Sequence, residues 1–108
     1  MRGELSSMED EVRKLIKQLN SNLELYEEPE YKITEKSEKG GEHLYIVHNL
    51  DAEMKEGEIY FGDMNDVIYN NQYALMGFLV DSIVNIEFKD KLVTIIFKSN
   101  SIKIEFVG

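Results

Sequence analysis

Apolar residues recur at helical spacing along the first quarter of the chain, and charged residues fill the positions between them. This spacing predicts an amphipathic helix over about residues 7–24 that buries one stripe against the rest of the protein. Ser6 followed by Glu9 has the form of a capping box, which marks a helix start. The apolar stripe consists of Met8, Val12, Leu15, Ile16, Leu19, Leu23 and Tyr26.

Two segments after this helix are rich in β-branched and aromatic residues, and a glycine pair lies between them. They predict a β-hairpin with strands at 31–36 and 43–49 and a turn at 39–41. A three-residue loop there places Ile33 opposite Val47, which keeps both apolar side chains on one face of the hairpin.

The middle of the chain is less regular. Residues 53–57 are polar and typical of a turn, and residues 58–61 predict a short strand suited to the edge of a sheet. The apolar spacing over 63–80 favours a second helix, whereas the Asn-Asn pair at 70–71 also suits a hairpin turn. The length of the segment favours the helix.

The last third of the chain predicts a three-stranded antiparallel meander. Two-residue loops at 90–91 and 99–100 place Ile86 opposite Ile95 and Ile95 opposite Ile104, so that apolar residues meet on one face. This face is expected to form the core. Its nine apolar residues are Val84, Ile86, Phe88, Val93, Ile95, Phe97, Ile102, Ile104 and Phe106.

These elements predict a single α+β domain over residues 1–108, with residues 1–7 as a disordered extension. Its order is an N-terminal amphipathic helix, a β-hairpin, a short strand, a second helix and the C-terminal meander. The alternative architecture is one helix with a mostly antiparallel β-barrel or sandwich. A chain of 108 residues with 43% hydrophobic and 31% charged residues is long and apolar enough to bury one core.

Several classes of chemistry find no support in the sequence. The chain has no cysteine, so disulfides, thiolate metal sites and a catalytic cysteine are excluded. His43 and His48 fall on opposite faces of one predicted strand and cannot share a metal ion. The acids that begin at Asp51 do not match a calcium loop, because Glu56 occupies the position of its invariant glycine. We therefore expect no enzyme, cofactor or metal site, and with no membrane-spanning stretch we expect a cytoplasmic protein.

The charge is unevenly distributed. Residues 1–81 hold eight lysines and arginines against eighteen acids, a net charge of −10, whereas residues 82–108 carry +1. A surface this negative disfavours direct nucleic-acid binding and favours a basic protein surface as partner. Acids alternate with tyrosines where the first helix ends, and these are the candidate partner-binding residues: Glu24, Tyr26, Glu27, Glu28, Glu30 and Tyr31.

The functional hypothesis is a small acidic protein-binding module that blocks a basic, nucleic-acid-handling surface, as inhibitor, immunity and anti-defence proteins do. One alternative is a ligand-binding or regulatory domain with a pocket between helix and sheet, lined by residues such as Tyr45, Tyr60 and Phe78. Another is a homo-oligomeric module, such as a homodimer. It would pair through Leu92 and Ile96, which are apolar residues on the polar face of the meander.

Overall fold

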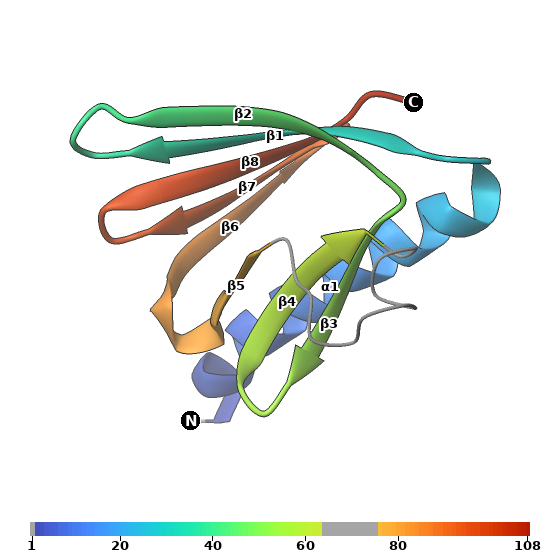
Figure 1. The fold of residues 1–108 in the computed structure, drawn as a ribbon. Helices are drawn as coiled ribbons and strands as arrows, with labels where there is room; N and C mark the ends of the chain where they lie inside the picture. Colours follow the sequence, from blue (N-terminus) through green and yellow to red (C-terminus); the bar gives the residue numbers. More distant parts are fainter. Residues whose placement is uncertain (1, 64–75) are drawn as a thin grey trace.

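A computed structural model describes residues 2–63 and 76–108 of the chain (Figure 1). The described residues form one α-helix, eight β-strands and a short 3-10 helix, which confirms the α+β class. In chain order the elements are α1 (Arg2–Leu25), β1 (Glu30–Ser37), β2 (Glu42–His48), β3 (Leu50–Lys55), β4 (Glu58–Asp63), β5 (Met76–Leu79), η1 (Val80–Ser82), β6 (Ile83–Lys89), β7 (Leu92–Phe97) and β8 (Asn100–Phe106).

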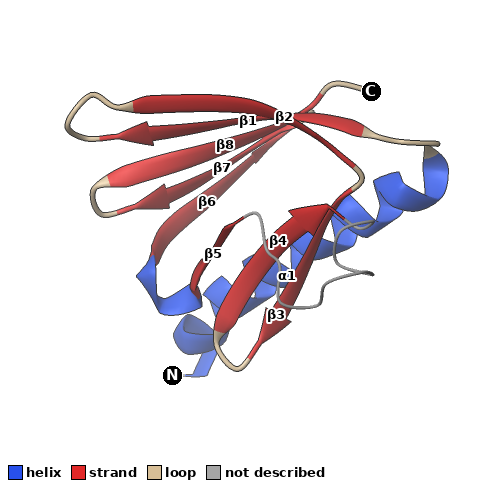
Figure 2. Cartoon of the chain, viewed as in Figure 1, coloured by secondary structure: helices blue, strands red, loops and turns tan. Residues whose placement is uncertain are grey.

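The strands form two antiparallel sheets whose edges are linked. The five-stranded sheet has the order β2-β1-β8-β7-β6, and the three-stranded sheet has the order β3-β4-β5. The edge strand β2 continues into β3 at Asn49, which adopts a left-handed φ of 56°, and β5 continues into β6 through η1. The described architecture is therefore closest to the alternative of one helix with a mostly antiparallel barrel or sandwich (Figure 2).

Helix α1 packs its apolar stripe against β3, β6 and η1. Val12 and Leu15 have no exposed surface and Leu19 is buried, as the helical spacing predicted. The helix ends at Leu25, close to the predicted end. It begins at Arg2, however, so Ser6 lies inside the helix and the predicted capping box does not mark its start.

The β1–β2 hairpin forms as predicted, but its register differs by two residues. Ile33 lies opposite Tyr45 and not opposite Val47. The three-residue loop begins one residue earlier than predicted, because Gly40 takes the left-handed position, with a φ of 96°. The Ser37 N–H donates to the Gly41 carbonyl at 2.8 Å and closes this loop. A shift of two residues leaves every side chain on its predicted face.

Two predictions for the middle of the chain were wrong. A polar turn was predicted over 53–57, but residues 53–55 belong to strand β3 (Leu50–Lys55) and the turn itself is confined to Glu56 and Gly57. Both turn residues have positive φ, 53° and 80°, which is the geometry of a type I′ hairpin turn. Strand β4 is the central strand of its sheet, between β3 and β5, and not an edge.

The second helix predicted over 63–80 is contradicted at both described ends of that segment. Asp63 is the last residue of β4, Met76–Leu79 forms strand β5, and Val80 begins η1. The rest of the prediction, including the alternative hairpin turn at 70–71, lies outside the described residues.

The meander β6–β7–β8 is confirmed, with two differences in register. Ile86 lies opposite Ile95 as predicted, but a β-bulge between Ile83 and Asn85 turns Val84 outward, where 60% of it is exposed. The second loop falls at 98–99 and not at 99–100, so Ile95 lies opposite Ile102. Apart from Val84, the predicted face is the one that faces the core.

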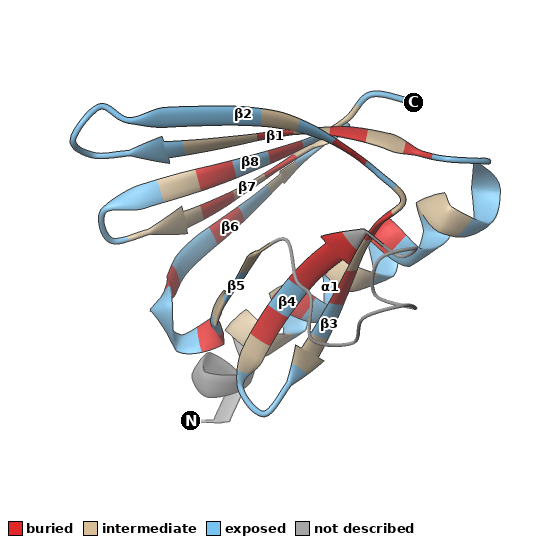
Figure 3. Ribbon diagram, in the orientation of Figure 1, coloured by how far each residue is buried: buried red, intermediate tan, exposed pale blue. Residues whose placement is uncertain are grey.

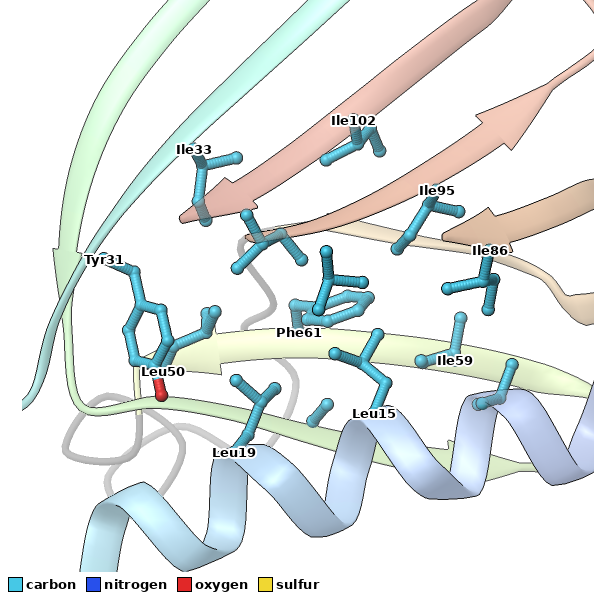
Figure 4. Close-up of a cluster of buried hydrophobic side chains, with 14 of the residues drawn as sticks. Leu15, Leu19, Tyr31, Ile33, Leu50, Ile59, Phe61, Ile86, Ile95 and Ile102 are labelled. Atoms are coloured by element: carbon cyan, nitrogen blue, oxygen red, sulfur yellow. The ribbon is translucent and has the colours of Figure 1, made fainter. Parts of the chain in front are cut away.

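One hydrophobic core fills the space between α1 and the inner faces of both sheets (Figures 3 and 4). No polar or charged residue among those described is buried. In the described part of the chain, no helix is long and apolar enough to cross a membrane. The buried residues of the core are Val12, Leu15, Leu19, Tyr31, Ile33, Val47, Leu50, Ala52, Ile59, Phe61, Val80, Ile83, Ile86, Val93, Ile95, Ile102 and Ile104.

Candidate protein-binding surface

The acids predicted to contact a partner lie where α1 ends and the chain turns into β1. Glu24, Glu27 and Glu28 are exposed, so their carboxylates are available to another molecule. Tyr26 is 47% exposed, and its ring packs on Phe106 with a centroid distance of 5.0 Å. These four residues form what we call the helix-exit cluster.

The other two predicted residues are engaged within the chain. Tyr31 is only 2% exposed, and its hydroxyl accepts a hydrogen bond of 2.8 Å from Nδ2 of Asn22. Burial raises the pKa of the Tyr31 hydroxyl. Glu30 Oε1 lies 3.3 Å from Nε2 of His48. Tyr31 is therefore a buried residue that packs beneath the end of α1 and is not available to a partner. Tyr26 is the exposed aromatic residue of the helix-exit cluster.

The structure brings a second group of acids together on the outer face of the three-stranded sheet. Glu53, Tyr60 and Gly77 lie opposite one another on β3, β4 and β5. Glu58 lies beside Tyr60 on the same face, because residues two apart in a strand point to the same side. We call this surface the acidic sheet face, and it consists of Asp51, Glu53, Glu56, Glu58 and Tyr60, with Lys55 as the lysine among them.

Tyr60 lies across the neighbouring strand because Gly77 has no side chain. A Cβ atom at Gly77 would lie 2.8 Å from Cδ1 of Tyr60, which is closer than packed atoms approach. The Tyr60 hydroxyl donates a hydrogen bond to the Glu58 carboxylate, and this bond raises the pKa of Tyr60. A shallow surface groove of about 370 Å³ lies beside the ring, lined by Glu58, Tyr60, Met76, Gly77, Phe78 and Leu79.

Asp51 lies at the β3 end of the same face and is half-buried. The backbone N–H of Ala52 donates a hydrogen bond of 2.9 Å to Oδ1 of Asp51. Desolvation by burial raises the pKa of Asp51, and the Ala52 hydrogen bond opposes this effect in part. The carboxylate is thus held in place but weakly solvated.

The turn predicted over 53–57 did not reveal the strand β3 that orders Asp51 and Glu53. The available signal was the alternation of Leu50, Ala52 and Met54 with polar residues, which is the pattern of a half-buried strand. Within the ranges that the structure describes, no group of three His, Asp or Glu residues is arranged to hold a metal ion.

A second groove, of about 310 Å³, separates the end of α1 from the meander. Tyr45, Tyr60 and Phe78, which were predicted to line a pocket between helix and sheet, do not line this groove. Tyr60 and Phe78 line the groove over Gly77, and Tyr45 lies on the inner face of the five-stranded sheet, where its hydroxyl donates to the Glu35 carboxylate. The groove beside α1 is lined by Leu15, Gln18, Leu19, Ser21, Asn22, Tyr26, Tyr31, Asp90, Lys91, Leu92, Val93, Ile104 and Phe106.

The remaining predicted residues lie on the five-stranded sheet. Leu92 and Ile96 are half-buried on the outer face of β7, an inner strand of that sheet. His43 and His48 have opposite orientations along β2, since only odd-numbered residues of that strand face the core beside Val47.

Comparison of the chain with protein-family models, with curated proteins and with solved structures found no match.

Proposed function

We propose that this protein is a small acidic protein-binding module that covers a basic, nucleic-acid-handling surface on a partner protein. Inhibitor, immunity and anti-defence proteins can act in this way, with carboxylates occupying a groove that is built for phosphates. The observation that best supports the proposal is the acidic sheet face, where Glu53 and Glu58 flank the exposed ring of Tyr60.

The acidic sheet face suits a binding site better than the helix-exit cluster for a structural reason. Apart from Glu56 in the β3–β4 turn, its acids project from hydrogen-bonded strands, which hold side chains more rigidly than a chain reversal does. At the helix exit, Tyr31 and Glu30 are already occupied by Asn22 and His48. The helix-exit cluster is therefore proposed as a supporting contact that strengthens electrostatic steering.

Tyr60 gives the acidic sheet face a specific way to recognise arginine. A guanidinium group can stack on the face of a tyrosine ring and donate two parallel hydrogen bonds to a carboxylate. Glu53 lies opposite Tyr60 on β3, and Glu58 accepts the Tyr60 hydroxyl. An arginine side chain of the partner that enters the groove beside Tyr60 could stack on the Tyr60 ring and bind the carboxylate of Glu53 or Glu58 at the same time.

The proposal is tested by affinity capture from a lysate of the source cell at low and moderate salt, with wild type and three charge-matched variants. We expect one stoichiometric basic partner that the face variant loses, the exit variant retains in part and the control retains fully. Equal capture by the face variant and the control would contradict the proposal. The face variant is Glu53→Gln/Glu56→Gln/Glu58→Gln, the exit variant is Glu24→Gln/Glu27→Gln/Glu28→Gln, and the control is Glu38→Gln/Glu87→Gln/Glu105→Gln.

The groove beside α1 supports a second candidate function, the binding of a small ligand. Its volume of about 310 Å³ is at the lower end of ligand sites, and its wall combines apolar side chains with the amide of Asn22. Native mass spectrometry of protein isolated from the source cell would reveal a bound small molecule. The ligand should be lost from a Ser21→Trp variant that fills the groove; an unliganded wild-type protein would count against this function.

A further inference from the structure

Strand β2 is an open edge of the five-stranded sheet. It is the outermost strand on its side, and no strand among those described pairs with its outer edge (Figure 1). Open edges are commonly protected by lysine, proline or a bulge, and the opposite edge β6 has both a bulge next to Val84 and Lys89. Strand β2, with the sequence EHLYIVH, has neither lysine nor proline.

The backbone groups that β2 offers can be assigned from its pairing with β1. The Ser37 N–H bonds the Gly41 carbonyl at one end of the hairpin, and the Asn49 N–H bonds the Pro29 carbonyl at the other. Because hydrogen-bonded residues alternate along an antiparallel strand, the odd-numbered residues of β2 bond β1. The N–H and C=O groups of Glu42, Leu44, Ile46 and His48 therefore point to the open edge.

The same even-numbered residues carry two of the large exposed apolar side chains. Leu44 is 55% exposed and Ile46 is 49% exposed, and both lie on the outer face of the sheet. The charged lysines and acids of β1 and β2 on that face are balanced, because Lys32 and Lys36 are accompanied by Glu30 and Glu42. The excess of acid carried by the whole chain is thus not concentrated here.

We propose that two copies of this chain pair through β2, antiparallel and around a two-fold axis at Tyr45, so that the two sheets become continuous. In this register Leu44 lies opposite the partner subunit's Ile46, and Glu42 lies opposite the partner subunit's His48. Both pairs join even-numbered residues, so the free N–H and C=O groups of the two edges meet. The pairing buries Leu44 against the partner subunit's Ile46. It also places the carboxylate of Glu42 beside the imidazole of the partner subunit's His48.

A second copy fits this edge because the strand is complementary to itself. Under two-fold symmetry each favourable pair occurs twice, and the two apolar pairs lie directly on either side of the axis. The proposal differs from pairing through Leu92 and Ile96, which are half-buried in the middle of the sheet. It is also independent of the proposed function, since the acidic sheet face is on the other sheet.

The test combines sedimentation velocity with amide hydrogen exchange over a range of protein concentrations. We expect a dimer at high concentration, with the amides of Leu44 and Ile46 exchanging more slowly in the dimer than in the monomer. These amides have no partner within the described part of one chain, so their protection reports edge pairing directly.

Paired substitutions test the register. Leu44→Lys/Ile46→Lys places like charges opposite each other and should raise the dimer dissociation constant by about ten-fold or more. Leu44→Lys/Ile46→Glu places lysine opposite glutamate at both pairs and should dimerise more strongly than the first variant. Val84→Lys, on the far edge, makes the same kind of change at an exposed apolar residue and should leave the dimer unchanged.

Circular dichroism should confirm that all three variants fold, because the substituted side chains lie outside the core. The proposal is overturned if the wild type sediments as a monomer at every concentration. It is equally overturned if a dimer forms without protection of the Leu44 and Ile46 amides, or if the two paired variants dimerise equally well.

Discussion

Asp51, a residue of the acidic sheet face, lowers the stability of the folded protein at neutral pH while its carboxylate is held in a fixed position. Burial raises its pKa above the ordinary value of 3.8, so the folded protein disfavours the carboxylate at neutral pH. Above the folded-state pKa this penalty is present in full, and below about pH 3.8 it vanishes because both folded and unfolded states bind the proton. The carboxylate is nevertheless held at the surface by the Ala52 amide.

We therefore predict that Asp51→Asn raises the midpoint of thermal unfolding at pH 7. The asparagine Oδ1 still accepts the Ala52 hydrogen bond, while the desolvated charge is removed. The gain should shrink as the pH falls and disappear near pH 3, as followed by circular dichroism melts at several pH values. An equal gain at pH 3 and pH 7 would mean that charge desolvation is not its cause.

The identity of single residues predicts turns better than it predicts registers. The pair Gly40-Gly41 correctly indicated a hairpin turn, but either glycine can occupy the left-handed position. The structure uses Gly40, which moves the register by two residues. Because such a shift keeps every side chain on its face, the apolar pattern cannot distinguish the two registers.

At the scale of the element, α1 is predicted to contribute to stability through its buried stripe. Leu15 has no exposed surface and projects from α1 into the core, as Figure 4 shows. Leu15→Ala should lower the free energy of unfolding by about 2–5 kcal/mol, because it removes apolar contacts and leaves a cavity. The exposed Gln18→Ala is the matched control and should change it by less than about 0.5 kcal/mol in urea unfolding. Similar losses for both variants would show that the helix does not pack as described.

Long periodic elements were predictable from sequence, whereas elements defined by their neighbours were not. The stripe of α1 and the apolar face of the meander each contain enough residues to specify their type. Strand β3 alternates over only six residues and runs directly into the polar turn at Glu56 and Gly57, so its second half was interpreted as part of that turn. Strand β5 has only four residues, and the helical spacing before it masked its strand character.

At the scale of the whole molecule, the candidate binding surface depends on how distant segments pair. The composition alone shows that acids outnumber basic residues, and the structure places Glu24, Glu27 and Glu28 exposed where α1 ends. The sequence offered no means of placing Glu53 and Gly77 beside Tyr60, because their proximity follows from the order β3-β4-β5. Local sequence patterns predict where charges lie and which segments form strands or helices. They do not predict the order in which the strands pair in a sheet.

Binding of a basic partner by the acidic sheet face should depend on salt, and this dependence can be measured directly. Dissociation constants of the captured partner should be measured from about 50 to about 500 mM salt for wild type and for Glu53→Gln/Glu58→Gln. We predict at least about ten-fold weaker binding by the variant at low salt and a shallower dependence on salt, because fewer charges are paired. Equal affinities with equal salt dependence would mean that Glu53 and Glu58 do not contact the partner.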